Sequence, residues 1–538
     1  MTDSILFWNA VALEANRVSF SDPSKAEQQG PTLSSRALAI VHLAMYDAYA
    51  GIIGTSGFPR YLNPPVAPAG ISAQNAVAGA AFQTLSELYS MQKSFFEDQL
   101  ACFDENDPSF KFGVKVGKAV LALRANDPGA GSDGYKTSNN RYRHRVDPDN
   151  PDQGFHAPYY GIYSKNFAVT MRHALNKPYS TNGGTVDPLY LAALRQVRAK
   201  GIKPELTATL PDKVNAPNVN LFAQRRTSDE STIGVFWGYD GSNRLGTPPR
   251  FFNQIIRQVA MNVVNPVTGA INNEGQNARL FAFANAAMGD AGILAWEQKY
   301  CHDFWRPVVG IREHDELYGP QAPYPNEKAA TEDSDSGWLP FGAPSTNLSP
   351  KKNFTPHFPA YPSGHATFGA ASLHVTRLFY GVKTGNRAKD KLFTKMTLVS
   401  EEFNGKNRDN QNTLRPNHTR EFSEGLWQMI IENGISRVFL GVHWVFDALD
   451  LKVKSGLVVP DTEITNDKIG GIGLGLRIAE DIFAAGNKLA PVVSNVGPTV
   501  APPAPPTQPA DIKGCIGVTK GEEKQEVEGR FLQGLSNR

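Results

Sequence analysis

Apolar residues recur at helical spacing along most of the chain. In the segment 34–53, for example, Leu38, Val41, Met45 and Ala48 fall on one stripe of a helix. The alternation of apolar and polar residues that is typical of half-buried strands is scarce. The pattern therefore predicts a mainly α fold. Helical spacing is found at 5–17, 34–53, 73–104, 109–126, 188–200, 250–264, 276–302, 365–381, 388–404, 420–434 and 476–486.

Segments rich in proline, glycine and asparagine divide the predicted helices into groups. Two of them, 127–165 and 202–220, have the composition of irregular connections. A third, 491–509, contains seven prolines and is expected to be extended. We therefore predict two helical bundles with long irregular connections and a Pro-rich C-terminal tail. The predicted units are a bundle at 1–201, a connection at 202–230, a second bundle with the functional site at 231–456, and a Gly/Pro-rich extension at 457–538, partly wrapping the surface or disordered.

The composition is that of an ordinary soluble protein of 538 residues, with 41% hydrophobic and 20% charged residues. A formal net charge of +2 gives no reason to expect a nucleic-acid or membrane partner. Three isolated cysteines predict neither a disulfide framework nor a zinc site. We expect a soluble protein without a conventional signal peptide, either cytoplasmic or exported by an unconventional route. Its oligomeric state is left open.

The segment Tyr361–Thr367 is a turn that leads into a predicted helix. The first backbone N–H groups of a helix have no partner within the helix, so this end can bind an anion. Ser363 is a good N-cap, Gly364 permits close approach to the backbone, and His365 titrates near neutral pH. The alternative is an ordinary helix cap with a histidine on its surface.

Two cations lie near the end of the long predicted helix at 276–302. Lys299 and Arg306 are seven positions apart, about two helical turns, so both can project from one face. The alternative is that each pairs with a local carboxylate such as Glu297 or Asp303. The pair becomes a candidate anion site only if other groups join it.

A third polar cluster is embedded in the apolar segment 436–448. A buried Arg437 requires an anion, and a buried His443 requires a hydrogen-bond partner or a ligand. Asp447 follows His443 by about one turn and could fix its tautomer, either as a core pair or as support for a ligand. Taken alone, this segment is ambiguous.

Together the three clusters read K-x6-RP, PSGH and SR-x5-H-x3-D, in this order. The combination resembles the signature of the vanadium-dependent haloperoxidases and the type 2 phosphatidic acid phosphatase and bacterial acid phosphatase superfamily. The resemblance is greatest to the fungal-type vanadium chloroperoxidases and extends to about residue 486. It is carried by ILFWNAVALEANRV near the start and by the stretches 236–255, 290–312, 358–369 and 436–448.

The resemblance implies two helical bundles with an oxyanion pocket in the second. His443 would be the single protein ligand to vanadium, and His365 the acid/base group beside the site. Lys299 would also polarise the bound peroxide, and Asp240 matches the carboxylate that pairs with the second arginine. The vanadate oxygens would be held by Lys299, Arg306, Arg437, Ser363 and the N–H of Gly364.

Two aromatic residues match the halide site of the chloride-oxidising relatives. These are Trp296 and Phe358, and bromide-specific algal relatives have histidine at the position of Phe358. The resemblance therefore favours chloride competence. His357 stands where the fungal pattern has proline, so its ring could alter halide affinity or proton supply, or simply face solvent.

The predicted function is oxidation of chloride and bromide with hydrogen peroxide to hypohalous acid, which halogenates organic acceptors. The predicted cofactor is vanadate, and no haem, flavin or nicotinamide motif is present in the sequence. The predicted partners are small molecules only. A first alternative is an acid phosphatase that forms a phosphohistidine on His443. A second is a helical protein that binds an oxyanion without catalysis.

Overall fold

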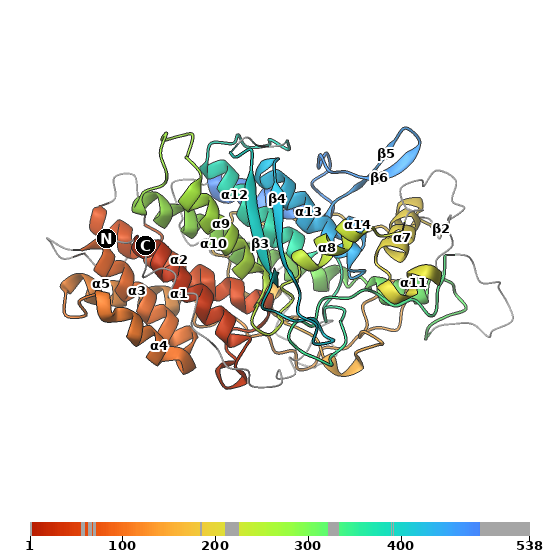
Figure 1. The fold of residues 1–538 in the computed structure, drawn as a ribbon, viewed down its shortest axis with the longest axis horizontal. Helices are drawn as coiled ribbons and strands as arrows, with labels where there is room; N and C mark the ends of the chain where they lie inside the picture. The colour runs from red at the N-terminus through yellow and green to blue at the C-terminus, as the bar shows by residue number, and fades with distance from the viewer. Residues whose placement is uncertain are drawn as a thin grey trace.

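The structure is a computed structural model that describes residues 3–54, 60–62, 67, 72–182, 185–209, 225–320, 333–388, 390 and 392–484. These residues form 15 α-helices and few strands, so the predicted mainly α fold is confirmed (Figure 1). The helices are α1 (Ser4–Ser19), α2 (Gly30–Ile53), α3 (Ala73–Leu88), α4 (Lys93–Asp98), α5 (Pro108–Leu123), α6 (Tyr160–Tyr163), α7 (Pro188–Lys200), α8 (Ser228–Phe236), α9 (Pro248–Asn262), α10 (Glu274–His302), α11 (Pro307–Arg312), α12 (Gly364–Phe379), α13 (Gly425–Phe439), α14 (Val445–Ala448) and α15 (Gly470–Ala484).

The described strands form three antiparallel two-stranded ribbons. Two of these are short, and the longest is the β3–β4 hairpin, which crosses the middle of the molecule in Figure 1. The strands are β1 (Thr181–Asn182), β2 (Thr185–Val186), β3 (Met396–Asn404), β4 (Asn417–Phe422), β5 (Leu451–Lys454) and β6 (Leu457–Pro460).

The helices pack in two groups that share one core. Helices α1, α2, α3 and α5 pack against one another at one end of the molecule, and α9, α12, α13 and α15 form the second group (Figure 1). Helix α10 contacts both α2 and α12, so it joins the groups. The buried apolar residues accordingly form a continuous cluster from Ile5 to Ile482. The domain boundaries given above remain a prediction.

Helix α10 is buried on nearly all sides, as expected for a helix surrounded by others. Asn273 and Gln276 form a capping box at its start, each side chain accepting from the other residue's backbone N–H. At its end Asp303 adopts the left-handed conformation, with φ 52°, and its N–H donates to the carbonyl of Lys299 at 2.8 Å. The chain then turns so that Arg306 precedes α11. The two cations predicted to share a site therefore flank a helix end.

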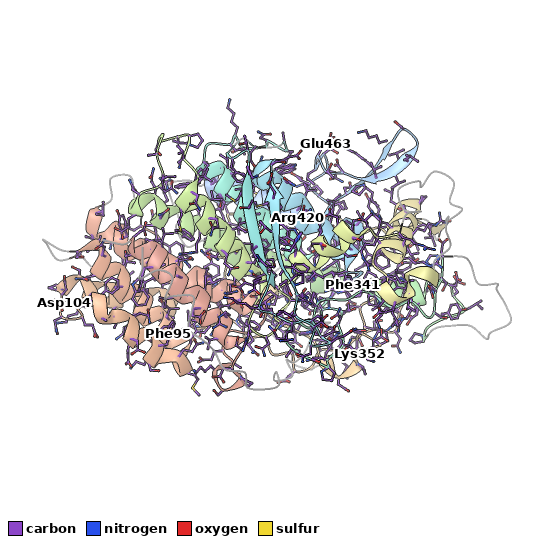
Figure 2. All side chains as sticks on the ribbon, in the orientation of Figure 1. Phe95, Asp104, Phe341, Lys352, Arg420 and Glu463 are labelled. Atoms are coloured by element: carbon purple, nitrogen blue, oxygen red, sulfur yellow. The ribbon has the colours of Figure 1, made fainter. Side chains whose placement is uncertain are left out.

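The predicted helix at 388–404 is wrong, because residues 396–404 form strand β3. It pairs with β4 in the register Met396 opposite Phe422, and its burial alternates. Leu392, Met396 and Val399 also fit helical spacing, so the local pattern could not separate the two structures. Pairing with β4 is what makes these residues a strand. Arg420 of β4, labelled in Figure 2, donates to the carboxylates of Glu432 and Asp229.

Residues 457–484, which we predicted as the start of the C-terminal extension, form β6 and the largely buried α15. Helix α15 lies along α12, the helix that begins at the predicted anion-binding turn. The two backbones approach closely because Gly471 and Gly475 have no side chains there. The predicted Pro-rich tail at 491–509 lies outside the described residues.

Gly475→Ala is expected to destabilise the protein by about 1–3 kcal/mol through overpacking. A Cβ at this position would lie 2.5 Å from the carbonyl oxygen of Thr367 and 2.7 Å from Cβ of Ala370, both on α12. Urea denaturation monitored by circular dichroism measures the effect. Gly129→Ala is the control, because a Cβ there meets nothing within 4 Å. Equal stability of the two variants would contradict the tight α12–α15 contact.

Among the described helices, α2 is long and apolar enough to cross a membrane. However, 72% of its most apolar window is buried inside the protein, against other helices. This burial is typical of a core helix of a helical protein.

Candidate active site

The turn before α12 places a helix N-terminus inside the protein. Ser363 is the N-cap of α12, and its own N–H donates to the carbonyl of Asp447 at 2.7 Å. Gly364 lines a cavity, where an added Cβ would lie 3.2 Å from the Trp296 ring. The first N–H groups of the helix, unpaired by helix geometry, are therefore next to a cavity. This arrangement fits the predicted anion site.

Three buried cations surround this turn, although they come from distant parts of the chain. Lys299 at the end of α10, Arg306 before α11 and Arg437 on α13 are each at most 1% exposed. Lys299 Nζ donates to the carbonyls of Pro359 at 2.8 Å, Ala360 at 3.1 Å and Pro362 at 2.5 Å. The predicted alternative partner Glu297 instead binds Arg172.

Each of the two arginines uses only part of its guanidinium group in hydrogen bonds to the protein. Arg306 donates through Nε to Phe358 O and through Nη1 to Val442 O, both at 2.8 Å. Arg437 Nη2 donates to Asp240 Oδ1 at 2.6 Å. Within the described part of the chain, Arg306 Nη2 and Arg437 Nε and Nη1 are buried and have no acceptor.

Buried guanidinium N–H groups without acceptors are costly, and these three nitrogens in one site fit an anion with several oxygens. The nearby carboxylates do not replace it. Burial raises the pKa of Asp447 to about 7 and also raises the pKa of Asp240, against the effect of Arg437. Burial lowers the pKa of Arg306 to about 9. A tetrahedral oxyanion would satisfy both the charges and the donors.

The imidazole of His443 is held with one nitrogen available to a ligand. Arg306 Nη1, which can only donate, lies 2.9 Å from Nε2, so Nε2 is the unprotonated nitrogen. Nδ1 then carries the hydrogen and donates to Asp447 Oδ2 at 2.7 Å. Burial, reinforced by Arg306 and Lys299, lowers the pKa of His443 well below its ordinary value. A neutral imidazole in this orientation is a suitable metal ligand.

In His365, unlike His443, Nε2 is hydrogen-bonded to the protein as a donor and Nδ1 is the unprotonated nitrogen. Its Nε2 lies 2.7 Å from the carbonyl oxygen of Gly238, so Nε2 carries the hydrogen and Nδ1 can accept a proton. Burial, together with Arg437, lowers the pKa of this imidazole. Asn433 Nδ2 fixes its backbone by donating to the His365 carbonyl at 2.8 Å. Asp240 Oδ1 lies 3.9 Å from Nε2.

Two aromatic rings cover the cations on one side. The rings of Trp296 and Phe358 are 4.8 Å apart, and Lys299 Nζ lies 5.6 Å and 5.1 Å from their respective centroids. Arg306 lies 5.0 Å from the Phe358 ring. These cation–π contacts hold the positive groups at an apolar wall.

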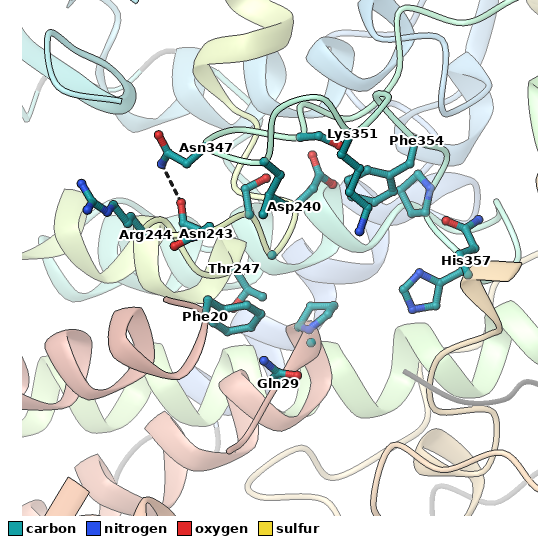
Figure 3. Close-up of a pocket in the computed structure, with 18 of the residues that line it drawn as sticks. Phe20, Gln29, Asp240, Asn243, Arg244, Thr247, Asn347, Lys351, Phe354 and His357 are labelled. Atoms are coloured by element: carbon teal, nitrogen blue, oxygen red, sulfur yellow. Dashed lines mark hydrogen bonds between the residues drawn. The ribbon is translucent and has the colours of Figure 1, made fainter. Parts of the chain in front are cut away.

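All the residues predicted for the site lie in one region. A cavity of about 1050 Å³ reaches it, and Asp240 can be followed on its wall in Figure 3. Four predicted residues do not line the cavity but lie next to residues that do: Lys299 and Arg306 contact Phe358, Arg437 binds Asp240, and Ser363 precedes Gly364. Those that line the cavity are Asp240, Trp296, Phe358, Gly364, His365 and His443.

Sequence reasoning missed several residues that hold the site together. Gly238 accepts from His365, and Glu402 on β3 accepts from the N–H of Tyr239 at 3.3 Å, which positions the loop that carries Asp240. His156 lies beside Trp296, whose indole N–H donates to the His156 carbonyl at 3.2 Å. These contacts join residues more than 100 positions apart, and no local motif marks them.

Across the described residues, no three His, Cys, Asp or Glu side chains gather as a metal site. The three buried cations and the one imidazole nitrogen that are present suit a metal held as an oxyanion. The buried N–H groups without acceptors fit vanadate and phosphate equally well in shape.

Comparison with known proteins identifies relatives whose names contain vanadium. Residues 1–166 match the vanadium chloroperoxidase N-terminal domain, and residues 279–452 match the second helical-bundle domain of these enzymes. The chain is 32% identical to the vanadium chloroperoxidase of Curvularia inaequalis, over 95% of each sequence.

Solved structures share the fold at low sequence identity. A bacterial vanadium-dependent iodoperoxidase aligns with a TM-score of 0.55 and 16% identity, over 88% of this chain and 95% of that one. The holo form of a bacterial vanadium-dependent chloroperoxidase aligns with a TM-score of 0.52 and 15% identity, over 88% and 96%. Because the identity to the fungal enzyme extends over nearly the whole length of both chains, this protein belongs to the vanadium chloroperoxidase family.

Proposed function

We propose that this protein is a vanadate-dependent haloperoxidase that oxidises chloride and bromide. The reaction consumes hydrogen peroxide, halide and one proton and gives hypohalous acid and water. The observation that carries the proposal is that three guanidinium nitrogens without acceptors and the unprotonated Nε2 of His443 lie in the same site. This combination offers both charge compensation and one metal ligand to the same oxyanion.

The residues divide into a ligand and a cradle. His443 would bind vanadium through Nε2, with Asp447 holding the tautomer. Asp240 would restrain Arg437 through Nη2, which leaves Nε and Nη1 of Arg437 for the anion. The vanadate oxygens would be held by Lys299, Arg306, Arg437, Ser363 and the N–H of Gly364.

Bound vanadate supplies a Lewis acid that activates peroxide toward halide attack without a change in its oxidation state. His365 would accept and return the proton at Nδ1, because its other nitrogen is committed to Gly238. Lys299 would place its positive charge where negative charge develops on oxygen. No haem, flavin or nicotinamide is required.

The aromatic wall would favour chloride as well as bromide. Trp296 and Phe358 exclude water beside the cations, and a halide that loses part of its hydration there is compensated by positive charge. His357 lines the cavity one residue away, and its buried Nε2 has no hydrogen-bond partner among the described groups.

Incubation of the vanadate-free protein with orthovanadate, then with peroxide and chloride or bromide, tests the proposal. We expect halogenation of an activated diketone only when vanadate, peroxide and halide are all present, with about one vanadate bound per chain. Hydrolysis of p-nitrophenyl phosphate without vanadate-dependent halogenation would instead support the phosphatase, in which His443 Nε2 attacks phosphorus. Vanadate binding with neither activity would support a non-catalytic binding protein.

A further inference from the structure

The cavity that reaches the site is much larger than its small substrates need. Its volume of about 1050 Å³ slightly exceeds that of most pockets for drug-sized ligands, which measure roughly 300–1,000 Å³. Peroxide and halide ions need only a narrow passage. The space between the surface and His443 is therefore large enough for an organic molecule.

One part of the cavity wall is apolar and rigid. It is built from the connection between α1 and α2, the start of α9 and the segment before α12, which lie far apart in sequence. Prolines and aromatic rings offer flat apolar surface at little cost in side-chain entropy. The residues that form this wall include Phe20, Pro31, Pro248, Leu348, Phe354 and Phe358.

The outer part of the same cavity carries positive charge. Lys351, Lys406 and Arg408 line it and are exposed, and none of them forms an ion pair with a carboxylate in the described part of the chain. The carboxylate of Asp409 accepts from the N–H groups of Gln411 and Thr413, at 2.9 Å and 2.8 Å. Figure 3 shows Lys351 and Phe354 on the same wall of the pocket. Positive groups and apolar surface are thus presented to one ligand.

We infer that the outer cavity, bounded by Lys351, Lys406, Arg408 and the apolar wall, binds an anionic aromatic or enolic acceptor for halogenation. This inference rests on the proposed function. The carboxylate of the acceptor pairs with the basic side chains, and its ring packs on Phe354 and the prolines. The electron-rich carbon then faces the inner site. There, hypohalous acid replaces a ring hydrogen with halogen, and the displaced proton leaves with hydroxide as water.

Binding to the vanadate-free protein tests the site independently of catalysis. Isothermal titration calorimetry with 4-hydroxybenzoate is expected to show saturable binding, at least about tenfold tighter than with the uncharged 4-hydroxybenzamide. The affinity should fall as salt is added, since exposed ion pairs are screened. Equal affinity for the two compounds, or no binding of either, would overturn the inference.

Two double variants remove the same number of positive charges, one at the cavity and one away from it. Lys351→Ala/Lys406→Ala is expected to weaken 4-hydroxybenzoate binding about tenfold or more. The control Lys352→Ala/Lys383→Ala removes two exposed lysines that do not line the cavity and should bind as the parent does. Equal weakening in both double variants would overturn the inference, because it would reflect only the overall charge.

A competition experiment then asks where halogenation occurs. The holoenzyme acts on an equal mixture of the two compounds with bromide and peroxide, and added hypobromite provides the reference ratio of products. We expect the parent enzyme to favour 4-hydroxybenzoate severalfold beyond this reference, and the Lys351→Ala/Lys406→Ala enzyme to return toward it.

A parent ratio equal to that of hypobromite would overturn the inference while leaving the proposed function intact. A higher halide KM in the variant with an unchanged product ratio would also overturn it, since the lysines would then steer halide. Ligand binding without any halide oxidation would support the cavity site and reject the proposed function.

Discussion

Replacement of His443 by alanine is expected to abolish firm vanadate binding. His443 Nε2 accepts from Arg306 Nη1, on the same guanidinium as the acceptor-free Nη2, and Asp447 fixes it in the binding tautomer. Changing an outer-shell partner of a metal ligand typically costs about 10- to 100-fold in affinity, so losing the ligand itself should cost more than roughly 100-fold. Equilibrium dialysis with orthovanadate, followed by vanadium analysis, measures the loss.

Substitution of a second buried histidine is the control that distinguishes loss of the metal ligand from loss of the fold. His42 is 1% exposed and is bonded to Asn9 and to the carbonyl of Leu38, outside the candidate site. His42→Ala should lower stability and retain vanadate binding within a few-fold. Asp447→Asn should fall between the two, with binding about 10- to 100-fold weaker. Firm vanadate binding by His443→Ala would remove this residue from the metal.

Replacement of His365 by alanine is expected to have the second-largest effect, on turnover and not on binding. His365 contributes a neutral imidazole whose Nε2 is committed to Gly238, so its proposed role is proton transfer at Nδ1. General acid–base groups typically contribute about 10²- to 10⁴-fold, and we expect kcat for bromide oxidation to fall by this factor. Vanadate affinity, measured in the same preparation, should change by only a few-fold.

Chemical rescue provides the control for this variant. The cavity reaches His365 from the surface, so free imidazole should enter and restore part of the lost turnover in His365→Ala. Imidazole should restore nothing in His443→Ala at the same concentration, because that variant lacks bound vanadate. A His365→Ala enzyme with unchanged kcat would exclude His365 from proton transfer.

The sequence predicted most of the helices because their apolar stripes are local. The pattern at 276–302 corresponds to α10, and the pattern at 365–381 corresponds to α12. The β3–β4 hairpin was missed because Met396 and Val399 fit both periods, and only pairing with residues 417–422 distinguishes them. Helix α15 was underestimated because its glycines weaken the apolar pattern, although they permit close packing on α12.

The candidate site was predicted from three motifs, each contained within about a dozen residues. The order K-x6-RP, PSGH and SR-x5-H-x3-D is a property of the sequence alone. The sequence did not determine whether each charge is compensated locally. In the structure Glu297 binds Arg172, from a segment well before α10, and Arg437 binds Asp240 from a loop almost 200 positions earlier.

The sequence by itself therefore determined the helical fold class, the family and the chemical types gathered at the site. Only the tertiary structure decided which nitrogen of each histidine is free, which guanidinium N–H groups lack an acceptor, and that the site opens into a cavity with basic side chains. The physical reason is range. Helix periodicity and motif spacing depend on neighbours along the chain, whereas hydrogen bonding and charge compensation of buried groups depend on residues that only folding brings together.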